Sequence, residues 1–196
     1  MKIVFATKNK GKVNEVVKIF NTDKIELVTM EQAGIDIDVV EDGTTFEENA
    51  EKKAVEIMKA SGEAAIADDS GLEIDFLDKQ PGIHSARFLG HDTPYSIKNA
   101  KILDMLKDVP EEKRTARFVC AVCLALPDGR IIRSKGTLEG RIGNKITGEN
   151  GFGYDPIFFI SEKNCYSAEL STEEKNKISH RGKAMAEMRE KILEIL

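Results

Sequence analysis

Four groups of side chains in the sequence are suited to phosphate, metal or nucleobase chemistry. The first group occupies residues 7 to 12 and consists of Thr7, Lys8, Asn9, Lys10, Gly11 and Lys12. Between a strand and a helix, such a segment can direct lysines, backbone N–H groups and a helix N-terminus at a phosphate chain. It is not a P-loop, because Ala6 and Val13 stand where that motif needs Gly and Ser or Thr. The segment therefore predicts a phosphate-binding loop or, alternatively, a solvated basic turn.

Carboxylates form the second group. Asp68 and Asp69 directly follow the apolar run 64–67, and Glu41 with Asp42 supplies further carboxylates. Carboxylate oxygens suit magnesium, a hard ion that is usually shared with substrate phosphates. Consecutive strand residues point to opposite faces, so only one of Asp68 and Asp69 can be a direct ligand unless the strand has already ended. The alternative interpretation is an acidic turn over residues 68–71.

An aromatic side chain between two glycines forms the third group, at residues 151–156. Glycine allows close backbone approach, so Phe152 can present its ring to a flat ligand such as a nucleobase. A tight turn around a core aromatic would have the same sequence.

Three basic side chains near the last helical region form the fourth group. On one continuous helix, Lys175 and His180 would point about 140° apart, and Arg181 would lie further round. They can converge only if the helix breaks near Lys177 and restarts with Ser179 as its cap. An ordinary polar helix face is the alternative.

Strands and helices that could position these groups alternate along the chain. The patterns predict strands at 2–6, 64–67, 116–126 and 130–136, the last two joined by a hairpin turn. They predict helices at 13–20, from the capping box at 45–48 to residue 62, from Thr93-Pro94 to about residue 107, and from the capping box at 171–174 to the C-terminus. The third helix should bury Ile97, Ile102, Leu103 and Leu106. Residues 136–153 are expected to be largely irregular.

Composition narrows the class of protein. The chain has 196 residues, of which 41% are hydrophobic and 32% charged, with a net charge of −5. This predicts one folded domain or two packed lobes, and it argues against a broad nucleic-acid interface. No apolar run suggests a membrane span or signal peptide, so we expect a cytoplasmic protein. Cys120 and Cys123 lie an odd number of residues apart in a β-type run, which predicts buried thiols rather than a shared zinc.

Six stretches of the sequence, in this order, closely resemble the inosine triphosphate pyrophosphatase family, also called the non-canonical purine NTP pyrophosphatases. They cover residues 5–12, 41–50, 67–72, 81–87, 151–156 and 179–181. The resemblance implies an α/β fold with two lobes around a long, mixed, twisted β-sheet with flanking helices. It also implies an active-site cleft between the lobes, one functional domain over residues 1–196, and a homodimer.

The resemblance assigns a role to each group of side chains. Residues 7 to 12 would hold the triphosphate, Ser70 would contact the phosphate region, and Asp69 would be the general base. Magnesium would bind to carboxylates, for which the candidates are Asp69, Glu41 and Asp68. Phe152 would stack on the base, and the pocket around it would be shaped or contacted by Gly153, Tyr154, Asp155, Lys175, His180 and Arg181.

The implied reaction is hydrolysis of ITP, dITP and XTP to a nucleoside monophosphate and pyrophosphate, which would cleanse the nucleotide pool. Asp69 would take a proton from a water that attacks the α-phosphorus. Arg181 or His180 could bond the 6-oxo group of the purine, whereas rejection of guanine must depend on the 2-position. Two other hypotheses are a phosphohydrolase that releases orthophosphate and a nucleotide sensor without catalysis.

Overall fold

The computed structural model describes residues 1–20 and 23–196, and its strands form one mixed sheet in the order β2-β1-β3-β4-β5-β6-β7. The strands are β1 Lys2–Phe5, β2 Glu26–Thr29, β3 Ala64–Ile74, β4 Thr115–Ala125, β5 Ile131–Ile142, β6 Phe158–Ile160 and β7 Cys165–Tyr166. β1 is parallel to β2 and β3, whereas β6 is antiparallel to β5 and β7. The expected α/β fold with a mixed sheet is confirmed.

Five α-helices flank the described strands: α1 Lys10–Phe20, α2 Phe46–Ser61, α3 Tyr95–Met105, α4 Thr172–Ile178 and α5 His180–Glu194. Local capping explains two of their starts. Thr45 Oγ1 accepts a hydrogen bond from Glu48 N at 3.1 Å before α2. Ser171 and Glu174 form a full capping box before α4. Both starts agree with the sequence patterns.

The chain divides into two compact units. Unit 1 comprises Met1–Asp69, Cys120–Gly136 and His180–Leu196, and unit 2 comprises Ser70–Val119 and Thr137–Ser179. Because β3, β4 and β5 change unit along their length, each contributes residues to both.

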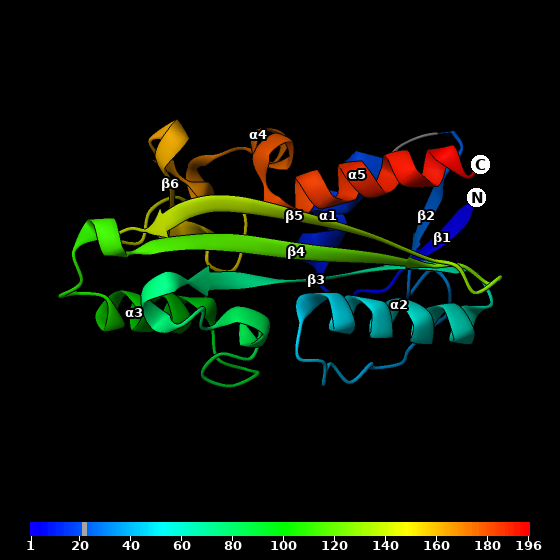
Figure 1. Cartoon of the computed structure of the whole chain (residues 1–196), viewed down its shortest axis with the longest axis horizontal. Helices are drawn as coiled ribbons and strands as arrows, with labels where there is room; N and C mark the ends of the chain where they lie inside the picture. The colour runs from blue at the N-terminus through cyan, green and yellow to red at the C-terminus, as the bar shows by residue number, and fades with distance from the viewer. Residues whose placement is uncertain (21–22) are drawn as a thin grey trace. The chain divides into compact units, whose positions relative to one another are not determined.

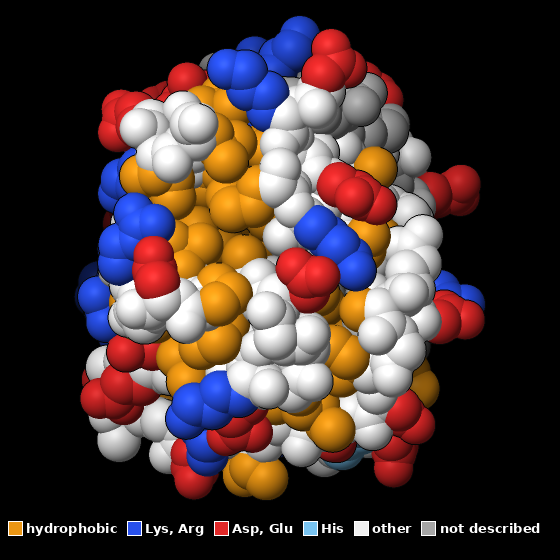
Figure 2. Space-filling model, turned by 90° about the vertical axis from the view of Figure 1, so that its right-hand side faces the viewer, with side chains coloured by type: hydrophobic (Ala, Val, Ile, Leu, Met, Phe, Trp, Pro, Cys, Tyr) orange, Lys and Arg blue, Asp and Glu red, His pale blue; other side chains and the backbone are white. Residues whose placement is uncertain are grey.

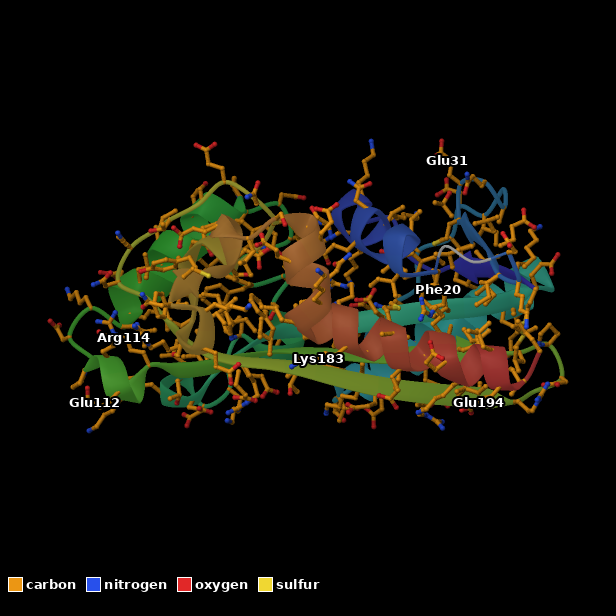
Figure 3. The ribbon with its side chains drawn as sticks, turned by 90° about the horizontal axis from the view of Figure 1, so that it is seen from above. Phe20, Glu31, Glu112, Arg114, Lys183 and Glu194 are labelled. Carbon is orange, nitrogen blue, oxygen red and sulfur yellow. The ribbon has the colours of Figure 1, made fainter. Side chains whose placement is uncertain are left out.

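Unit 1 packs helices on both faces of its strands: α1 and α5 lie on one face and α2 on the other (Figure 1). The core beneath α1 and α5 includes Phe5, Phe20, Met185 and Met188, each at most 1% exposed. Phe20 is the last residue of α1, Lys183 lies in the first turn of α5, and Glu194 is the last residue of α5 (Figure 3). This packing fixes the starts of α1 and α5, which carry two of the basic groups.

The end of unit 1 that carries both chain termini exposes hydrophobic side chains between charged ones (Figure 2). Ile195 and Leu196 are 37% and 55% exposed. Met1, Leu27 and Ile132 pack against the core but remain only partly buried. The core of unit 1 therefore reaches the surface at this end.

Unit 2 has its own core, built from the second half of β3, the first half of β4, the second half of β5, β6 and α3. Leu72, Ile102 and Phe158 are 0% exposed within it. The ring centroids of Phe118 and Phe158 lie 4.4 Å apart. Aromatic and branched side chains thus hold the framework on which the glycine-rich turn at 151–156 sits.

Two expectations about the strands are wrong. Residues 68–71 do not form a turn, because β3 continues through them to Ile74. Asp68 and Asp69 are 1% and 6% exposed, and Oδ2 of each carboxylate accepts a hydrogen bond from a side chain of the fold, so the backbone stays extended. β5 also runs further than expected, to Ile142, so the irregular segment begins only after it.

The third expected helix is shorter and differently capped. Thr93 Oγ1 donates to Leu89 O at 2.7 Å instead of capping α3, which begins after Pro94. Ile97 is 54% exposed while Ile102 is 0% exposed. They lie five positions apart on the helix, which is about 140° of rotation, so they cannot share one face.

The described residues contain no helix long and apolar enough to cross a membrane. Cys120, Cys123 and Cys165 are free, and the first two are buried as expected. Burial raises the pKa of Cys120 and of Cys123 to about 12. Both thiols therefore stay protonated near neutral pH.

Candidate active site

The segment from residue 7 to residue 12 joins β1 to α1, and Asn9 sets its shape. Asn9 Oδ1 accepts hydrogen bonds from Gly11 N at 2.9 Å and Lys12 N at 3.2 Å. Asn9 N donates to Thr7 Oγ1 at 3.2 Å. Asn9 therefore caps α1, and two N–H groups that we expected to face a phosphate bond its side chain instead. The positive charge of this segment is left to its lysines.

These lysines point in different directions. Lys8 Nζ pairs with Asp36 Oδ1 at 3.0 Å on the exposed surface, and Lys10 is exposed. The side chain of Lys12 is only 15% exposed, and its Nζ lies 3.0 Å from Asp68 Oδ2. Lys12 thus links the basic segment to the carboxylates of β3.

Asp68 is the centre of a buried charge network in unit 1. Arg181 Nε donates to Asp68 Oδ2 at 3.2 Å, and Arg181 Nη1 donates to Glu15 Oε2 at 2.5 Å. Arg181 is 3% exposed and Glu15 is 4% exposed. The network places α1, β3 and the first turn of α5 in one constellation. Each buried charge has an opposite charge within reach, as burial requires.

The electrostatics of Asp68 favour a permanent negative charge. Burial alone would raise the pKa of Asp68, but Lys12, Arg181 and Lys53 outweigh it and hold that pKa well below the usual range. Cys120 Sγ also lies 3.9 Å from Asp68 Oδ2, on the same side. Asp68 is therefore suited to holding cations and not to accepting a proton.

Asp69 faces a different set of partners. Its Oδ2 accepts from Asn49 Nδ2 at 3.0 Å, and its Oδ1 lies 3.9 Å from Lys53 Nζ. Both partners are on α2, whereas Asp68 contacts side chains of α1 and α5. The opposite orientation expected for neighbouring strand residues is confirmed. Burial raises the pKa of Asp69, and the charges of Lys53 and Lys12 offset only part of this rise. A carboxylate with a raised pKa is better suited to accepting a proton.

Glu41 joins Asp69 around the ammonium group of Lys53. Lys53 Nζ lies 2.5 Å from Glu41 Oε1 and also donates to Asp68 O at 2.8 Å. Asn49 Oδ1 accepts from Gly43 N at 2.8 Å, which fastens the segment that carries Glu41 to the same helix. A Cβ at Gly43 would lie 2.7 Å from Asn49 Oδ1, so only glycine allows this approach. Two carboxylates are thereby directed at one positive charge.

This arrangement fits a divalent cation in part. Glu41 and Asp69 offer hard oxygen ligands on one side of β3, and magnesium completes such a shell with waters and phosphate oxygens. Among the described residues, however, no group of three or more His, Cys, Asp or Glu side chains is gathered for a metal. Of the three candidate magnesium ligands, Asp68 does not join the other two, because strand alternation turns its side chain away from Glu41 and Asp69.

The last helical region is broken at the place that Lys175, His180 and Arg181 would need in order to converge. α4 ends at Ile178, Ser179 is extended with φ −68° and ψ 157°, and α5 begins at His180. The conditional expectation of a break is confirmed. His180 and Arg181 lie in the first turn of α5 in unit 1, whereas Lys175 belongs to unit 2. Ser70, on β3, is the first residue of unit 2 and is partly exposed.

The glycine-rich turn of unit 2 is held by its buried Tyr154. Tyr154 OH donates to Ser85 O at 2.7 Å, and its ring meets Tyr95 edge-on at 5.1 Å. Asn99 Nδ2 donates to Gly153 O at 3.1 Å. Tyr154 is 3% exposed, whereas Phe152 remains partly exposed. Tyr154 is therefore the core aromatic of this turn, whereas Phe152 keeps part of its surface accessible.

Asp155 connects the turn to α4. Its Oδ2 accepts from Phe152 N at 2.8 Å and from Lys175 Nζ at 2.7 Å. The same Nζ lies 5.0 Å from the centroid of the Phe152 ring, a cation–π contact. Unit 2 thus combines a flat ring with a donor-only cation beside it, which suits a flat ligand that carries carbonyl oxygens.

Ser167 Oγ also donates to Asp155 Oδ1 at 2.7 Å. The sequence patterns missed four residues that contact the expected site residues: Glu15, Asn49, Lys53 and Ser167. A signal exists for two of them, because Asn49 and Lys53 lie among Ala50, Ala54 and Ile57 on the buried face of α2. A polar side chain on such a face needs a partner. Which partner it finds depends on tertiary structure alone.

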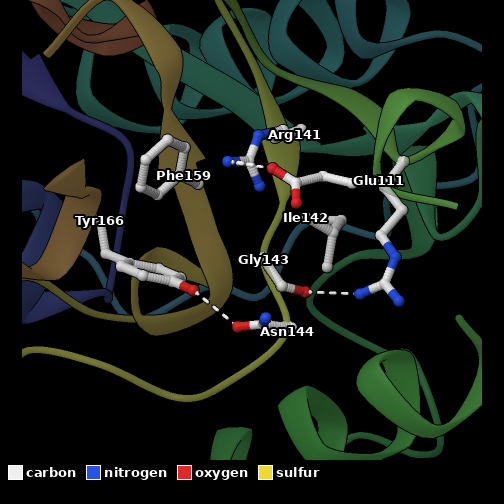
Figure 4. Close-up of a pocket in the computed structure, with 8 residues that line it drawn as sticks. Glu111, Arg141, Ile142, Gly143, Asn144, Phe159 and Tyr166 are labelled. Carbon is white, nitrogen blue, oxygen red and sulfur yellow. Dashed lines mark hydrogen bonds and ion pairs between the residues drawn. The ribbon is translucent and has the colours of Figure 1, made fainter. Parts of the chain in front are cut away.

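A separate pocket in unit 2 contains none of the expected site residues. It has a volume of about 140 Å³ and is lined by Glu111, Arg114, Arg141, Ile142, Gly143, Asn144, Phe159 and Tyr166 (Figure 4). Arg141 is paired with Glu111 and stacks 4.1 Å from the Phe159 centroid. Arg114 Nη1 donates to Gly143 O at 3.1 Å. Both arginines of this pocket therefore already bond groups of the protein.

Comparison with known proteins supports the resemblance seen in the sequence. The chain is 46% identical over 196 residues to a dITP/XTP pyrophosphatase of Desulforamulus reducens, covering 100% of this chain and 96% of that protein. It is also 46% identical over 185 residues to a dITP/XTP pyrophosphatase of Geobacter sulfurreducens, covering 94% and 93%.

Solved structures agree with these relatives. The Ham1 protein of Staphylococcus aureus matches with a TM-score of 0.89 and 38% identity over 100% of both chains. A HAM1 protein from Coxiella burnetii matches with a TM-score of 0.90 and 35% identity over 99% of both chains. The sequence model of the Ham1 family matches residues 3–191. With a match of this extent and relatives this similar along their whole length, the chain belongs to the Ham1 family.

Proposed function

We propose that this protein is a nucleoside triphosphate pyrophosphatase that hydrolyses dITP, ITP and XTP to the nucleoside monophosphate and pyrophosphate. The observation that carries the proposal is the pair of neighbouring carboxylates on β3 with opposite electrostatics. Asp68 is held ionised by Lys12 and Arg181, whereas burial raises the pKa of Asp69. The relatives named dITP/XTP pyrophosphatases supply the substrate class.

In the proposed mechanism, Asp69 accepts a proton from the water that attacks the α-phosphorus. Glu41 and Asp69 are the side chains that would hold magnesium. When bound there, that ion would neutralise charge on the phosphate oxygens and the leaving pyrophosphate. Lys12 would contribute positive charge on the side of Asp68, and the exposed Lys8 and Lys10 would attract the triphosphate. Asn49 would keep the Asp69 carboxylate oriented.

Base recognition would belong to unit 2 and to the start of α5. Phe152 would stack on the purine, and Lys175 would donate to its carbonyl oxygens. Arg181, which also donates from Nε and Nη1 to Asp68 and Glu15, or His180 would donate a hydrogen bond to the 6-oxo group of the purine. A 6-amino group would leave such donors unpaired, which disfavours adenine.

This proposal treats residues 1–196 as one functional domain, which is supported by the match of one family model to residues 3–191. We also propose a homodimer and a cytoplasmic setting, the latter supported by the free thiols of the chain. Elution volume with light scattering would test the dimer.

A substrate panel tests the proposed function. The purified protein is given magnesium and, separately, ITP, dITP, XTP, GTP and ATP, and both pyrophosphate and orthophosphate are measured. We expect pyrophosphate from the first three and much slower release from GTP and ATP. Orthophosphate as the product would favour the alternative phosphohydrolase, and no product with any nucleotide would favour a sensor. Equal rates with ITP and GTP would refute pool cleansing while leaving the pyrophosphatase class intact.

A further inference from the structure

Asp155 is the centre of a buried polar cluster in unit 2, which we call the Asp155 cluster: Phe152, Asp155, Ser167 and Lys175. Oδ2 of Asp155 accepts from Phe152 N and Lys175 Nζ, at 2.8 and 2.7 Å. Oδ1 accepts from Ser167 Oγ at 2.7 Å. Asp155, Ser167 and Lys175 are 2%, 0% and 4% exposed. The carboxylate is therefore held from both of its oxygens, away from water.

The two oxygens serve different purposes. Oδ2 contacts both groups that the proposed function assigns to the base, whereas Oδ1 contacts only Ser167 among the described residues. The two oxygens rotate together about one side-chain torsion, which is broad and weakly restrained for aspartate. Fixing Oδ1 therefore fixes the position of Oδ2, and with it the spacing between the Phe152 backbone and the Lys175 ammonium.

Ser167 is itself held rigidly. It begins a short 3-10 helix, Ser167–Glu169, and Glu169 Oε2 accepts from Tyr166 N at 2.7 Å just before it. Asn150 N donates to Ala168 O at 2.9 Å, so the segment leading into the glycine-rich turn is bonded to the same short helix. The Ser167 hydroxyl is thus a fixed point relative to the turn.

The turn also wraps Asp155 closely. Gly151 has φ +73°, and a Cβ there would collide with Asp155 Oδ2 and lie 3.3 Å from Lys175 Nζ. Little space is left for the carboxylate to find a second position that keeps both bonds. A rotated carboxylate would have to release Phe152 N, Lys175 Nζ or both.

We propose that Ser167 is a positioning residue for base recognition. Through Asp155, it sets the Phe152 ring and the Lys175 ammonium, 5.0 Å from that ring, in the arrangement that receives the purine. The inference rests on the proposed function, in which the base stacks on Phe152. Ser167 touches neither substrate nor reacting atoms in this account, so it should affect binding of the base and leave the chemical step unchanged.

Steady-state kinetics with ITP test this inference in the full-length protein. For Ser167→Ala we expect KM to rise roughly 3- to 10-fold with kcat within about twofold, because binding shared by ground and transition states is lost. The inhibition constant of inorganic triphosphate, which has no base, should stay within about twofold. Ser167→Thr keeps the hydroxyl and should restore KM. Ser167→Cys keeps the size with a weak donor and should resemble Ser167→Ala.

A matched control is Ser134→Ala. Ser134 is 7% exposed and donates one hydrogen bond to Ala184 O at 2.8 Å in unit 1. The substitution therefore shows what the loss of one buried serine hydrogen bond does to the enzyme when that bond lies outside the Asp155 cluster. We expect its KM for ITP to match the wild type. Thermal unfolding of every variant checks that each is folded.

Three results would overturn the inference. The first is an unchanged KM for ITP in Ser167→Ala, and the second is an inhibition constant of inorganic triphosphate that rises in Ser167→Ala as much as the KM for ITP does. The third is a KM for ITP that rises as much in Ser134→Ala as in Ser167→Ala. Failure of the proposed function is recognised separately, because the wild type would then release no pyrophosphate from ITP.

Discussion

Replacing Asp68 by Asn separates two roles that a carboxylate at this position could have. Asp68 Oδ2 lies 3.0 Å from Lys12 Nζ and 3.2 Å from Arg181 Nε, and Asp68 is 1% exposed. Removing one partner of a buried ion pair costs about 3–5 kcal/mol. Glu15 still pairs with Arg181 after the change, so we expect the lower end, about 3 kcal/mol. For a chain of this length, that lowers Tm by about 6–12 °C.

The pH dependence of this effect has a definite sign. The folded pKa of Asp68 lies well below its usual value of 3.8, so its charge stabilises the fold fully above that value. The stability gap between wild type and Asp68→Asn should therefore be constant near neutrality and narrow as the pH falls below about 3.8. A gap that widens on acidification would contradict this assignment.

Urea unfolding at pH 7 measures the free energy, and a magnesium titration of activity measures metal use. Asp128→Asn is the control, because Asp128 forms an ion pair with Arg130 at 52% side-chain exposure, where water screens the pair, so its loss should change the free energy of unfolding far less. Glu41→Gln should raise the magnesium concentration at half-maximal rate, whereas Asp68→Asn should leave it within about twofold. The reasoning is refuted if Asp68→Asn unfolds like Asp128→Asn, or if its magnesium requirement rises as in Glu41→Gln.

Two further predictions follow from buried groups. Asn49→Ala removes the hydrogen bond to Asp69 Oδ2, and loss of such a supporting contact should lower kcat by about 10- to 100-fold. Steady-state kinetics measures this change. A kcat within about twofold of the wild type would argue against a positioning role for Asn49. Burial raises the pKa of Cys120 and Cys123 to about 12, so a thiol reagent at pH 8 should label only Cys165 in the folded protein. Mass spectrometry identifies the labelled sites, and rapid labelling of Cys120 would show that its surroundings open.

Much of the fold follows from local signals in the sequence. Thr45 and Ser171 begin helices because the oxygen of each side chain accepts a hydrogen bond from a backbone N–H group in the first helical turn. Of these two starts, Ser171 forms the full capping box, whereas Glu48 Oε2 accepts a hydrogen bond from Thr44 N. Helix geometry made the break at Ser179 a condition for Lys175 and His180 to converge, because the two cannot point the same way on one helix, and the break is present. These features depend on residues close together in the chain.

The errors arise where tertiary contacts outweigh local preference. Asp68-Asp69-Ser70-Gly71 has the composition of a turn, yet it continues a strand, because Lys12 and Arg181 come from distant segments to neutralise a buried Asp68. No local pattern reports that pairing. The same holds for Ser167, whose partner Asp155 becomes recognisable only in the folded chain.

Pyrophosphate release from ITP by the Asp69→Asn variant tests the central claim most directly. Asn keeps the size of Asp69 but is a far weaker base, so it can no longer serve as the proton acceptor. The account predicts loss of turnover by about 1,000-fold or more, within the range of a general base acting with its metal. Binding of ITP should stay within a few-fold of the wild type. Near-normal turnover in Asp69→Asn would contradict the account.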